Sequence, residues 1–288
     1  MRFAAPSACL LAVAALTGAV ADRTPRRSPW TAGEYRVLTG DFHIHTFPFS
    51  ASTISPWDMV LEARHRGLDA IAITGHNETL SGKAGRWFAR LIGGPVVLAG
   101  EEVHGPHYHL IAAGIERTVD WRLSAAAAIA EVHRQGGIAI AAHPTYQSWK
   151  AFEGPAMQDL DGTEVAQPIA FHPQNQTWEL AEFFRRSGAA PIGSSDWHGM
   201  GPVGLCRTFL FVKDVSETGV MEAIRAHRTV VVDRGRVYGN LDLARAAGPR
   251  LWTPPPGSGI LGWISGLCGV LGLLFAALAV FSKPARRW

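Results

Sequence analysis

The chain has 288 residues, of which 47% are hydrophobic, and a formal net charge of +3 at pH 7. This length and composition fit one sizeable globular domain with appended segments. The charge is small, and no run of lysines or arginines is interleaved with aromatic residues, so the sequence predicts no nucleic acid as a macromolecular partner.

Residues 1–21 have the layout of a secretory signal peptide. Arg2 precedes an apolar run, and the small residues Ala19 and Ala21 have the spacing of a cleavage site after Ala21. Three arginines follow before residue 28, and positive charge on that side of an apolar run opposes translocation. We expect an exported chain in which residues 22–35 form a linker.

Apolar strand-like runs alternate with helix-like stretches over residues 36–240. Strands are predicted in RVLTGDFHIHT, LDAIAITGH, VVLAGEEV, HYHLIAAGI, IAIAAHP and APIGSSDWH, with helices such as SPWDMVLEARHRG between them. Ser55 and Pro56 are typical of a helix start, and Gly67 and Gly188 of helix ends. The alternation predicts an α/β fold with a mostly parallel sheet, either open or closed into a barrel.

Two histidines stand one residue apart in the first of these strands, DFHIHT. In an extended strand, His43 and His45 lie on one face, and Phe42 and Ile44 on the other. Asp41 would share the histidine face and could orient an imidazole. Two imidazoles on one face can hold a metal ion, although a polar strand face explains this short motif equally well.

Further metal-capable side chains stand just past apolar runs. These are His76, Glu102, His143, Asp196 and His198. The carboxyl ends of strands in parallel α/β folds gather at one rim, where active sites form. We therefore expect these side chains and the histidine pair to meet in a single metal site.

The end of the chain predicts a membrane anchor. Residues 241–259, which include TPPPGSG, form a Pro/Gly-rich spacer, and residues 260–281 contain no charge and are long enough to cross a bilayer. Residues 282–288 are basic and should stay in the cytoplasm, which places the preceding domain outside it. The GxxxG spacing of Gly262 and Gly266 predicts a weak homodimer contact.

The ordered set of motifs resembles the PHP family, named after polymerase and histidinol phosphatase domains. DFHIHT, ITGHN, AGEEV, HLIAAG, AHP and GSSDWHG follow one another from about Arg36 to Asn240. The resemblance implies a metal-dependent hydrolase on a distorted seven-stranded β/α barrel. ITGHN, and AGEEV followed by a GPH turn, also look like the carbaryl-hydrolase-like branch of metallohydrolases, which cleave carbamate, ester or amide bonds.

The resemblance also implies a set of metal ligands. His43, His45 and Asp196 would bind one metal ion, Glu102 would bridge it to a second ion held by His109 and His143, and a third site would use His76 and His198. We choose His109 over His107 because HLIAAG continues as the family's strand does, although both would face the same side.

Two positions depart from the family pattern. Ser50 stands where an aspartate or histidine is common, and Gly75 replaces an acidic residue. Both lie near the implied third site, so we expect two metal ions and a third that is weak or absent. Histidine and carboxylate ligands suit zinc, manganese or iron.

A metal pair can supply hydroxide from bound water, so the expected reaction is hydrolysis, with Asp196 or His198 available for proton transfer. The resemblance to the PHP family favours a small phosphorylated molecule as the substrate. Two alternatives stay open. One is hydrolysis of a carbamate, ester or amide, and the other is a non-catalytic metal-binding or sensing module.

Overall fold

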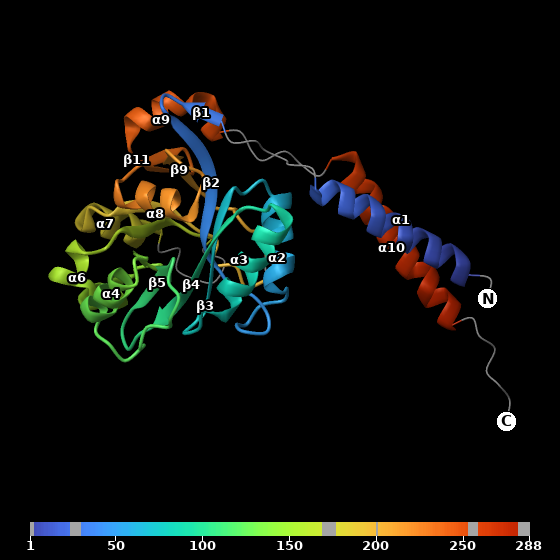
Figure 1. The fold of residues 1–288 in the computed structure, drawn as a ribbon, viewed down its shortest axis with the longest axis horizontal. Coiled ribbons are helices and arrows are strands. Elements are labelled where there is room, and N and C mark those ends of the chain that lie inside the picture. Colours follow the sequence, from blue (N-terminus) through green and yellow to red (C-terminus); the bar gives the residue numbers. More distant parts are fainter. Residues whose placement is uncertain (1–2, 24–29, 169–176, 200, 253–258, 282–288) are drawn as a thin grey trace. The chain divides into compact units, whose positions relative to one another are not determined.

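The computed structural model describes residues 3–23, 30–168, 177–199, 201–252 and 259–281 (Figure 1). It divides into two compact units. The globular unit comprises Arg27–Pro254, and the helical unit comprises Met1–Arg26 together with Pro255–Trp288. The predicted basic tail at 282–288 and residues 24–29 of the predicted linker lie outside the described residues.

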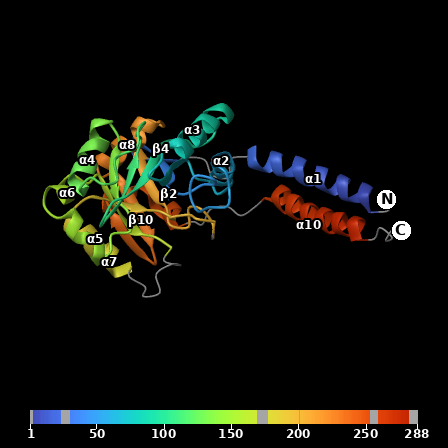
Figure 2. The same cartoon turned by 90° about the horizontal axis from the view of Figure 1, so that it is seen from below.

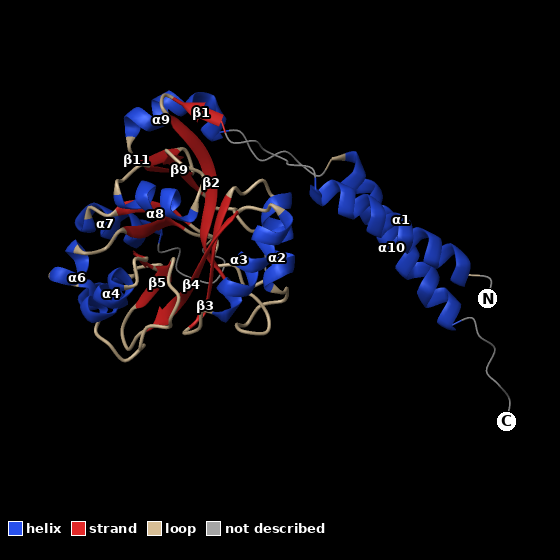
Figure 3. Ribbon diagram, viewed as in Figure 1, coloured by secondary structure: helices blue, strands red, loops and turns tan. Residues whose placement is uncertain are grey.

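Strands and helices alternate along most of the globular unit (Figure 3). The strands are β1 (Trp30–Ala32), β2 (Tyr35–Ile44), β3 (Ala70–His76), β4 (Val96–His104), β5 (His109–Ala113), β6 (Ile138–Ala141), β7 (Gly162–Ala166), β8 (Ala190–Gly193), β9 (Thr208–Val212), β10 (Thr229–Asp233) and β11 (Arg236–Gly239). The α-helices are α2 (Pro56–His65), α3 (Leu80–Ile92), α4 (Ala125–Arg134), α5 (Tyr146–Trp149), α6 (Pro155–Gln158), α7 (Thr177–Ser187), α8 (Glu217–Arg225) and α9 (Leu241–Ala247). Two 3-10 helices are η1 (Lys150–Phe152) and η2 (Gly248–Trp252).

These strands join one sheet in the order β11-β10-β9-β2-β3-β4-β5-β6-β7-β8, with β1 paired to β2. β2, β3 and β4 are parallel, as are β6, β7 and β8, but β5 is antiparallel to both neighbours and β9 is antiparallel to β2. The prediction of a mostly parallel sheet is therefore wrong. β4 and β5 form a hairpin, because the chain reverses in the short turn where the Gly105 amide donates to the Tyr108 carbonyl (2.9 Å).

The sheet nearly closes into a barrel. The Thr208 hydroxyl on β9 donates to the Gly193 carbonyl of β8 (3.0 Å) and accepts from the Gly193 amide (2.9 Å). Just past these strands, the His45 amide donates to the Trp197 carbonyl (3.0 Å), which ties the end of β2 to the loop after β8. The α/β barrel-shaped sheet expected from the sequence is thus present.

The apolar core fills the barrel and covers its outer face. One buried cluster contains residues of β2 to β6, β8 and β9, including Leu38, Ala72, Leu98, Ile111, Ile140, Ile192 and Leu210, and α8 adds Val220 and Ile224. Other clusters pack α2 and α3 on one side of the strands and α4, α6 and α7 on the other (Figures 1 and 2). The expected helix signals are present, since the Ser55 hydroxyl caps α2 by accepting from the Asp58 amide, and Gly67 has φ of 68°.

Ordered structure continues past Asn240, where the predicted domain ends. Helix α9 and η2 occupy the first part of the predicted spacer, and their residues Ala247 and Leu251 are buried in a cluster with Trp30 of β1. In the helical unit, α1 (Ala4–Arg23) and α10 (Ile260–Phe281) are both long and apolar enough to cross a membrane.

Candidate metal centre

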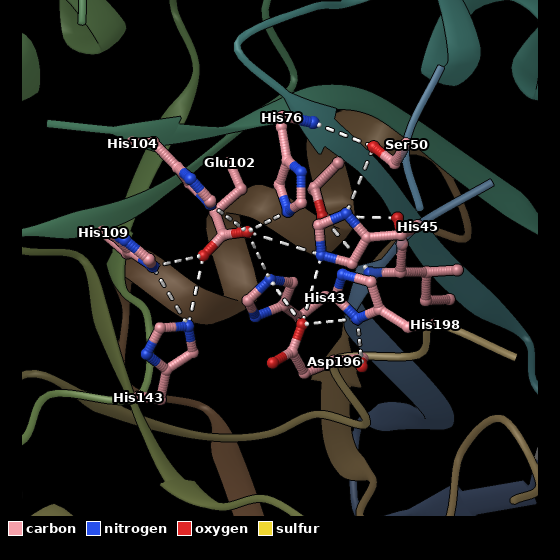
Figure 4. Close-up of polar contacts among 12 residues, drawn as sticks. His43, His45, Ser50, His76, Glu102, His104, His109, His143, Asp196 and His198 are labelled. Carbon is pink, nitrogen blue, oxygen red and sulfur yellow. Dashed lines mark hydrogen bonds and ion pairs between the residues drawn. The ribbon is translucent and has the colours of Figure 1, made fainter. Parts of the chain in front are cut away.

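Polar side chains replace apolar ones on the inner face of the barrel at one rim. In β3, His76 follows the core residue Ala72 by four positions, and in β4, Glu102 follows the core residue Leu98 by four positions. Because side chains alternate along a strand, an even spacing leaves both residues of each strand on the same face. All the residues predicted to bind metal or transfer protons gather there (Figure 4): His43, His45, His76, Glu102, His109, His143, Asp196 and His198.

The histidine pair of β2 converges on one carboxylate. The Nε2 atoms of His43 and His45 lie 3.2 and 3.1 Å from Oδ1 of Asp196, and both imidazoles are fully buried. The expected common face of the two histidines is thus present. Phe42 and Ile44 lie in two different core clusters rather than together, because the pairing of β2 with β3 shifts register between Asp41 and Ile44.

Glu102 stands at the centre, with its two oxygens facing different groups of histidines (Figure 4). Oε1 lies 3.0 Å from His109 Nδ1 and 3.1 Å from His143 Nε2. Oε2 lies within 3.0 to 3.4 Å of a nitrogen of each of four other histidines: His43, His45, His76 and His104. Glu102 therefore belongs to both groups of potential metal ligands.

A third group contains His45, His76 and His198, whose ligand nitrogens lie within 4.8 Å of one another. Ser50, in place of the family's acidic residue or histidine, accepts a hydrogen bond from the His76 amide (3.1 Å), and its hydroxyl oxygen lies 3.5 Å from His45 Nδ1. Ser50 therefore supports the histidines without adding a charge, so this group lacks a carboxylate of its own.

Gly75 is explained by its neighbour. A Cβ atom at this position would overlap Oε1 of Glu78, whose other oxygen accepts from the Ser81 amide (3.0 Å) in the first turn of α3. The position therefore has no room for the family's acidic side chain while Glu78 caps that helix.

Glu164, at the middle of β7, was missed in the sequence. Its Oε1 lies 2.9 Å from His43 Nδ1 and its Oε2 accepts from the His143 amide (2.6 Å), while the side chain is fully buried. It therefore orients ligands of both predicted metal ions. The same role was predicted for Asp41, and that prediction is wrong, because among the described residues the Asp41 carboxylate accepts from the backbone amides of His43, Ser195 and Gly204 and from no imidazole.

Two other residues extend the cluster beyond the predicted set. The imidazole of His104 stacks on that of His109 with ring centroids 3.9 Å apart, because the two residues face each other across the β4–β5 hairpin. Gln167 donates to Oδ2 of Asp196 (3.1 Å). The HxxxxH spacing of the hairpin, with a Gly-Pro turn between, was the available signal for His104. His107 is exposed, which agrees with the choice of His109.

Burial and charge set the protonation of the cluster. Burial lowers the pKa of His45 to about 3, so its imidazole is neutral. Burial also acts to lower the pKa of His43, but the carboxylates of Asp196, Glu102 and Glu164 outweigh it and hold that pKa well above its usual value. Burial acts to raise the pKa values of Glu102 and Asp196, but the charge on His43 outweighs it and holds both below their usual values. Glu102 and Asp196 are thus ionised at neutral pH.

The backbone is strained at two of the predicted ligands. His143 and Asp196 have positive φ values of 30° and 47°, although neither is glycine. His143 follows the end of β6, and Asp196 follows the end of β8. Such strain persists only where the surrounding structure holds it, and it clusters at functional sites.

The donor atoms fit divalent metal ions. Nε2 of His43 is buried without a hydrogen-bond partner, although it lies 3.2 Å from carboxylate oxygens of both Glu102 and Asp196. A buried polar atom of this kind calls for a ligand, and imidazole nitrogen with carboxylate oxygen is a donor set for zinc, manganese or iron. His43, His45, Glu102 and Asp196 form one group of donors, and Glu102, His109 and His143 form another.

A cavity of 790 Å³ opens over the cluster. It is lined by candidate ligands, by the β4–β5 turn and by polar residues that include Thr145, Gln147 and Ser148. No lysine or arginine among the described residues lines it. Its volume suits a small-molecule substrate.

No protein-family model matches the sequence. The chain is 30% identical over 139 residues to the uncharacterized protein MJ1587 of Methanocaldococcus jannaschii, covering 44% of this chain and 81% of that protein.

The chain also aligns with solved structures. A two-domain protein from Bacteroides vulgatus, described as containing a predicted PHP-like metal-dependent phosphoesterase, aligns with a TM-score of 0.59 and 24% identity over 76% of this chain and 71% of its own. An amidohydrolase from Chromobacterium violaceum aligns with a TM-score of 0.48 and 16% identity over 68% of this chain and 99% of its own. The globular unit therefore has the PHP fold, and the chain belongs to one family with MJ1587.

Proposed function

We propose that this protein is a metal-dependent hydrolase. The observation that carries the proposal is the position of the buried Glu102, whose two oxygens each face a separate group of candidate ligands. Two metal ions held there would supply a hydroxide nucleophile near neutral pH and offset the charge that develops on the substrate. His43, His45 and Asp196 would hold one ion, His109 and His143 the other, and Glu102 both.

The protein's own residues would prepare and complete the reaction. Glu164 holds the imidazole of His43 in place and fixes the backbone at His143. His198 lines the cavity, and its Nδ1 lies 2.9 Å from the backbone oxygen of Asp196, which orients the ring. We assign proton transfer to the leaving group to His198, because Asp196 contacts both His43 and His45 and serves as a ligand.

The favoured substrate is a small phosphoester. Support comes from the PHP fold and from the Bacteroides vulgatus protein of similar structure, which is described as containing a predicted PHP-like metal-dependent phosphoesterase. A second candidate is a neutral carbamate, ester or amide. The described cavity lining favours it, because that lining contains no lysine or arginine to accompany a phosphate.

We also propose that the globular unit lies outside the cytoplasm and that α10 anchors it to the membrane. The uncharged stretch of residues 260–281 and the basic residues that follow it support this placement.

The test begins with the metal content of the full-length protein, purified in detergent and supplemented with zinc, manganese or iron. Elemental analysis of the wild type should give about two ions per chain, and Glu102→Gln should lose them. Glu101→Gln is the matched control, since Glu101 is also buried in β4 but accepts from the Val119 amide, away from the cluster.

Substrates then separate the candidate reactions. A chromogenic phosphodiester and an aryl carbamate should be assayed side by side on the wild type and Glu102→Gln. Turnover of the phosphodiester, absent in the variant, supports the first choice, whereas exclusive turnover of the carbamate replaces it by the second. Bound metal without turnover of either would indicate a binding or sensing module.

A further inference from the structure

The two apolar helices of the helical unit pack against each other along their lengths and run in opposite directions (Figures 1 and 2). Near the start of α1, the ring of Phe3 lies 5.9 Å from that of Phe275 near the end of α10. Near the end of α1, Gly18 lies against Ser265 near the start of α10. The contacts therefore span both helices rather than one crossing point.

Small residues allow the two backbones to approach closely. An ideal Cβ atom at Gly269 would lie 3.8 Å from Cβ of Ala14, and one at Gly272 would lie 2.8 Å from Cγ of Leu11. Close approach at small residues is the usual way in which helices associate within a bilayer. The contacting face of α10 does not include Gly266 of the predicted GxxxG pair, because a Cβ atom at Gly266 would meet nothing within 4 Å.

Two hydrogen bonds join the helices. The Ser7 hydroxyl of α1 donates to the Gly272 carbonyl of α10 (2.9 Å), and the Ser265 hydroxyl of α10 donates to the Ala14 carbonyl of α1 (2.8 Å). A hydroxyl in the apolar part of a bilayer needs a partner in the protein. Each helix thus contributes a serine whose partner lies on the other helix.

The outward faces of both helices are apolar. Leu16 of α1 is 69% exposed, and Leu267 and Leu273 of α10 are 62% and 64% exposed. Polar atoms therefore face the partner helix while large aliphatic side chains face outward, which is the arrangement expected of a helix pair in lipid.

The predicted cleavage position lies inside α1. The helix continues to Arg23, past Ala19 and Ala21, and Ala21 is only 6% exposed. Proteolytic sites are preferentially exposed and irregular. Cleavage after Ala21 would also remove the partner of Ser265 and of the Gly272 carbonyl.

We propose that α1 is retained as a second membrane span, and that α1 and α10 form a two-helix anchor within one chain. This replaces the cleaved signal peptide expected from the sequence. The proposal does not depend on the hydrolase assignment, since it rests on contacts within the helical unit alone.

The experiment uses the full-length chain expressed in cells and kept in membranes. The native cysteines Cys9, Cys206 and Cys268 are first replaced by alanine, and Ala14→Cys is combined with Gly269→Cys. The 3.8 Å between the two Cβ positions matches the mean separation in disulfides. The control combines Leu16→Cys with Gly269→Cys, because Leu16 faces outward.

Two readouts decide the outcome. The intact mass of the wild type should include residues 1–21, and oxidation of the Ala14/Gly269 pair should give a reducible mobility shift in the monomer that the control pair does not give. A mature chain that begins at Asp22 would overturn the proposal. The proposal would also be overturned if α1 is retained but the Ala14/Gly269 cysteine pair forms no crosslink, or forms crosslinks only between two chains. Metal content and turnover of the same preparation report separately on the hydrolase.

Discussion

The fully buried carboxylate of Glu164 makes the most specific prediction about the metal centre. It accepts from two donors at once, with Oε1 2.9 Å from His43 Nδ1 and Oε2 2.6 Å from the His143 amide. Glutamine has one acceptor oxygen and one donor amide group, so in Glu164→Gln a donor must face a donor in either orientation. One hydrogen bond to a charged group, worth about 1.5 to 3 kcal/mol, is lost.

That loss should appear as weaker metal binding. A cost of about 1.4 to 2.8 kcal/mol corresponds to a 10- to 100-fold lower affinity, which is also the usual effect of removing a group that orients a metal ligand. We expect this change when the affinity of Glu164→Gln is measured by competition with a chromophoric chelator, against wild type and the control Glu101→Gln. Wild-type affinity in Glu164→Gln would refute the role of Glu164, and an equal loss in Glu101→Gln would show a general effect of altering a buried strand.

Three further predictions concern separate parts of the globular unit. His109→Ala should lower the metal content from about two ions per chain to about one, whereas His107→Ala should leave it unchanged; equal contents in the two variants would contradict the choice of ligand. The hydrogen bond from His133 to Asp161 (2.8 Å) raises the pKa of His133, so its stabilisation is complete below pH 6.5 and disappears as the pH rises past the raised pKa. His133→Ala should therefore lower the free energy of unfolding at pH 5.5 by less than about 1 kcal/mol, because the pair is partly exposed. The melting temperature should fall at pH 5.5 and stay unchanged at pH 9; a decrease of equal size at both pH values would argue against the ion pair. Burial raises the pKa of Cys206 to about 12, so at pH 8 this thiol should react with Ellman's reagent far more slowly in the folded than in the denatured protein, as peptide mapping would show; equal rates would mean that the site is open.

Much of the fold was predictable because hydrophobic runs and helix caps are local signals. The alternation of strands and helices and the start of α2 at Ser55 were both visible in the sequence. The expectation of a mostly parallel sheet did not anticipate the antiparallel β5, because a Gly-Pro turn of a few residues decides between a hairpin and a crossover. The packing of α9 on β1 joins segments about 200 residues apart, which no local pattern reveals.

The candidate ligands were also predictable, since most are histidines or carboxylates that stand just past an apolar strand, where such residues are easily noticed in the sequence. Glu164 was not, because it lies inside a short buried strand and its function depends on which strand faces it across the barrel. Asp41 shows the opposite error, because a role was predicted for it that the structure does not bear out. Periodicity placed it near His43, but only tertiary structure reveals that its oxygens are already occupied by the backbone amides of the loop after β8.

The turn between β4 and β5 contributes to the shape of the cavity but supplies none of the predicted metal ligands. Cavity shape and metal chemistry could therefore change independently, in evolution or by engineering. The candidate ligands lie on strands or just past their ends, whereas residues 105–108 line the cavity in the turn. The Tyr108 hydroxyl fastens this turn by donating to the Leu123 carbonyl (2.9 Å). Exchanging Pro106 or His107 would alter the shape of the entrance without moving Glu102. This tight loop is therefore the natural place to retune substrate choice while leaving the reaction chemistry as it is.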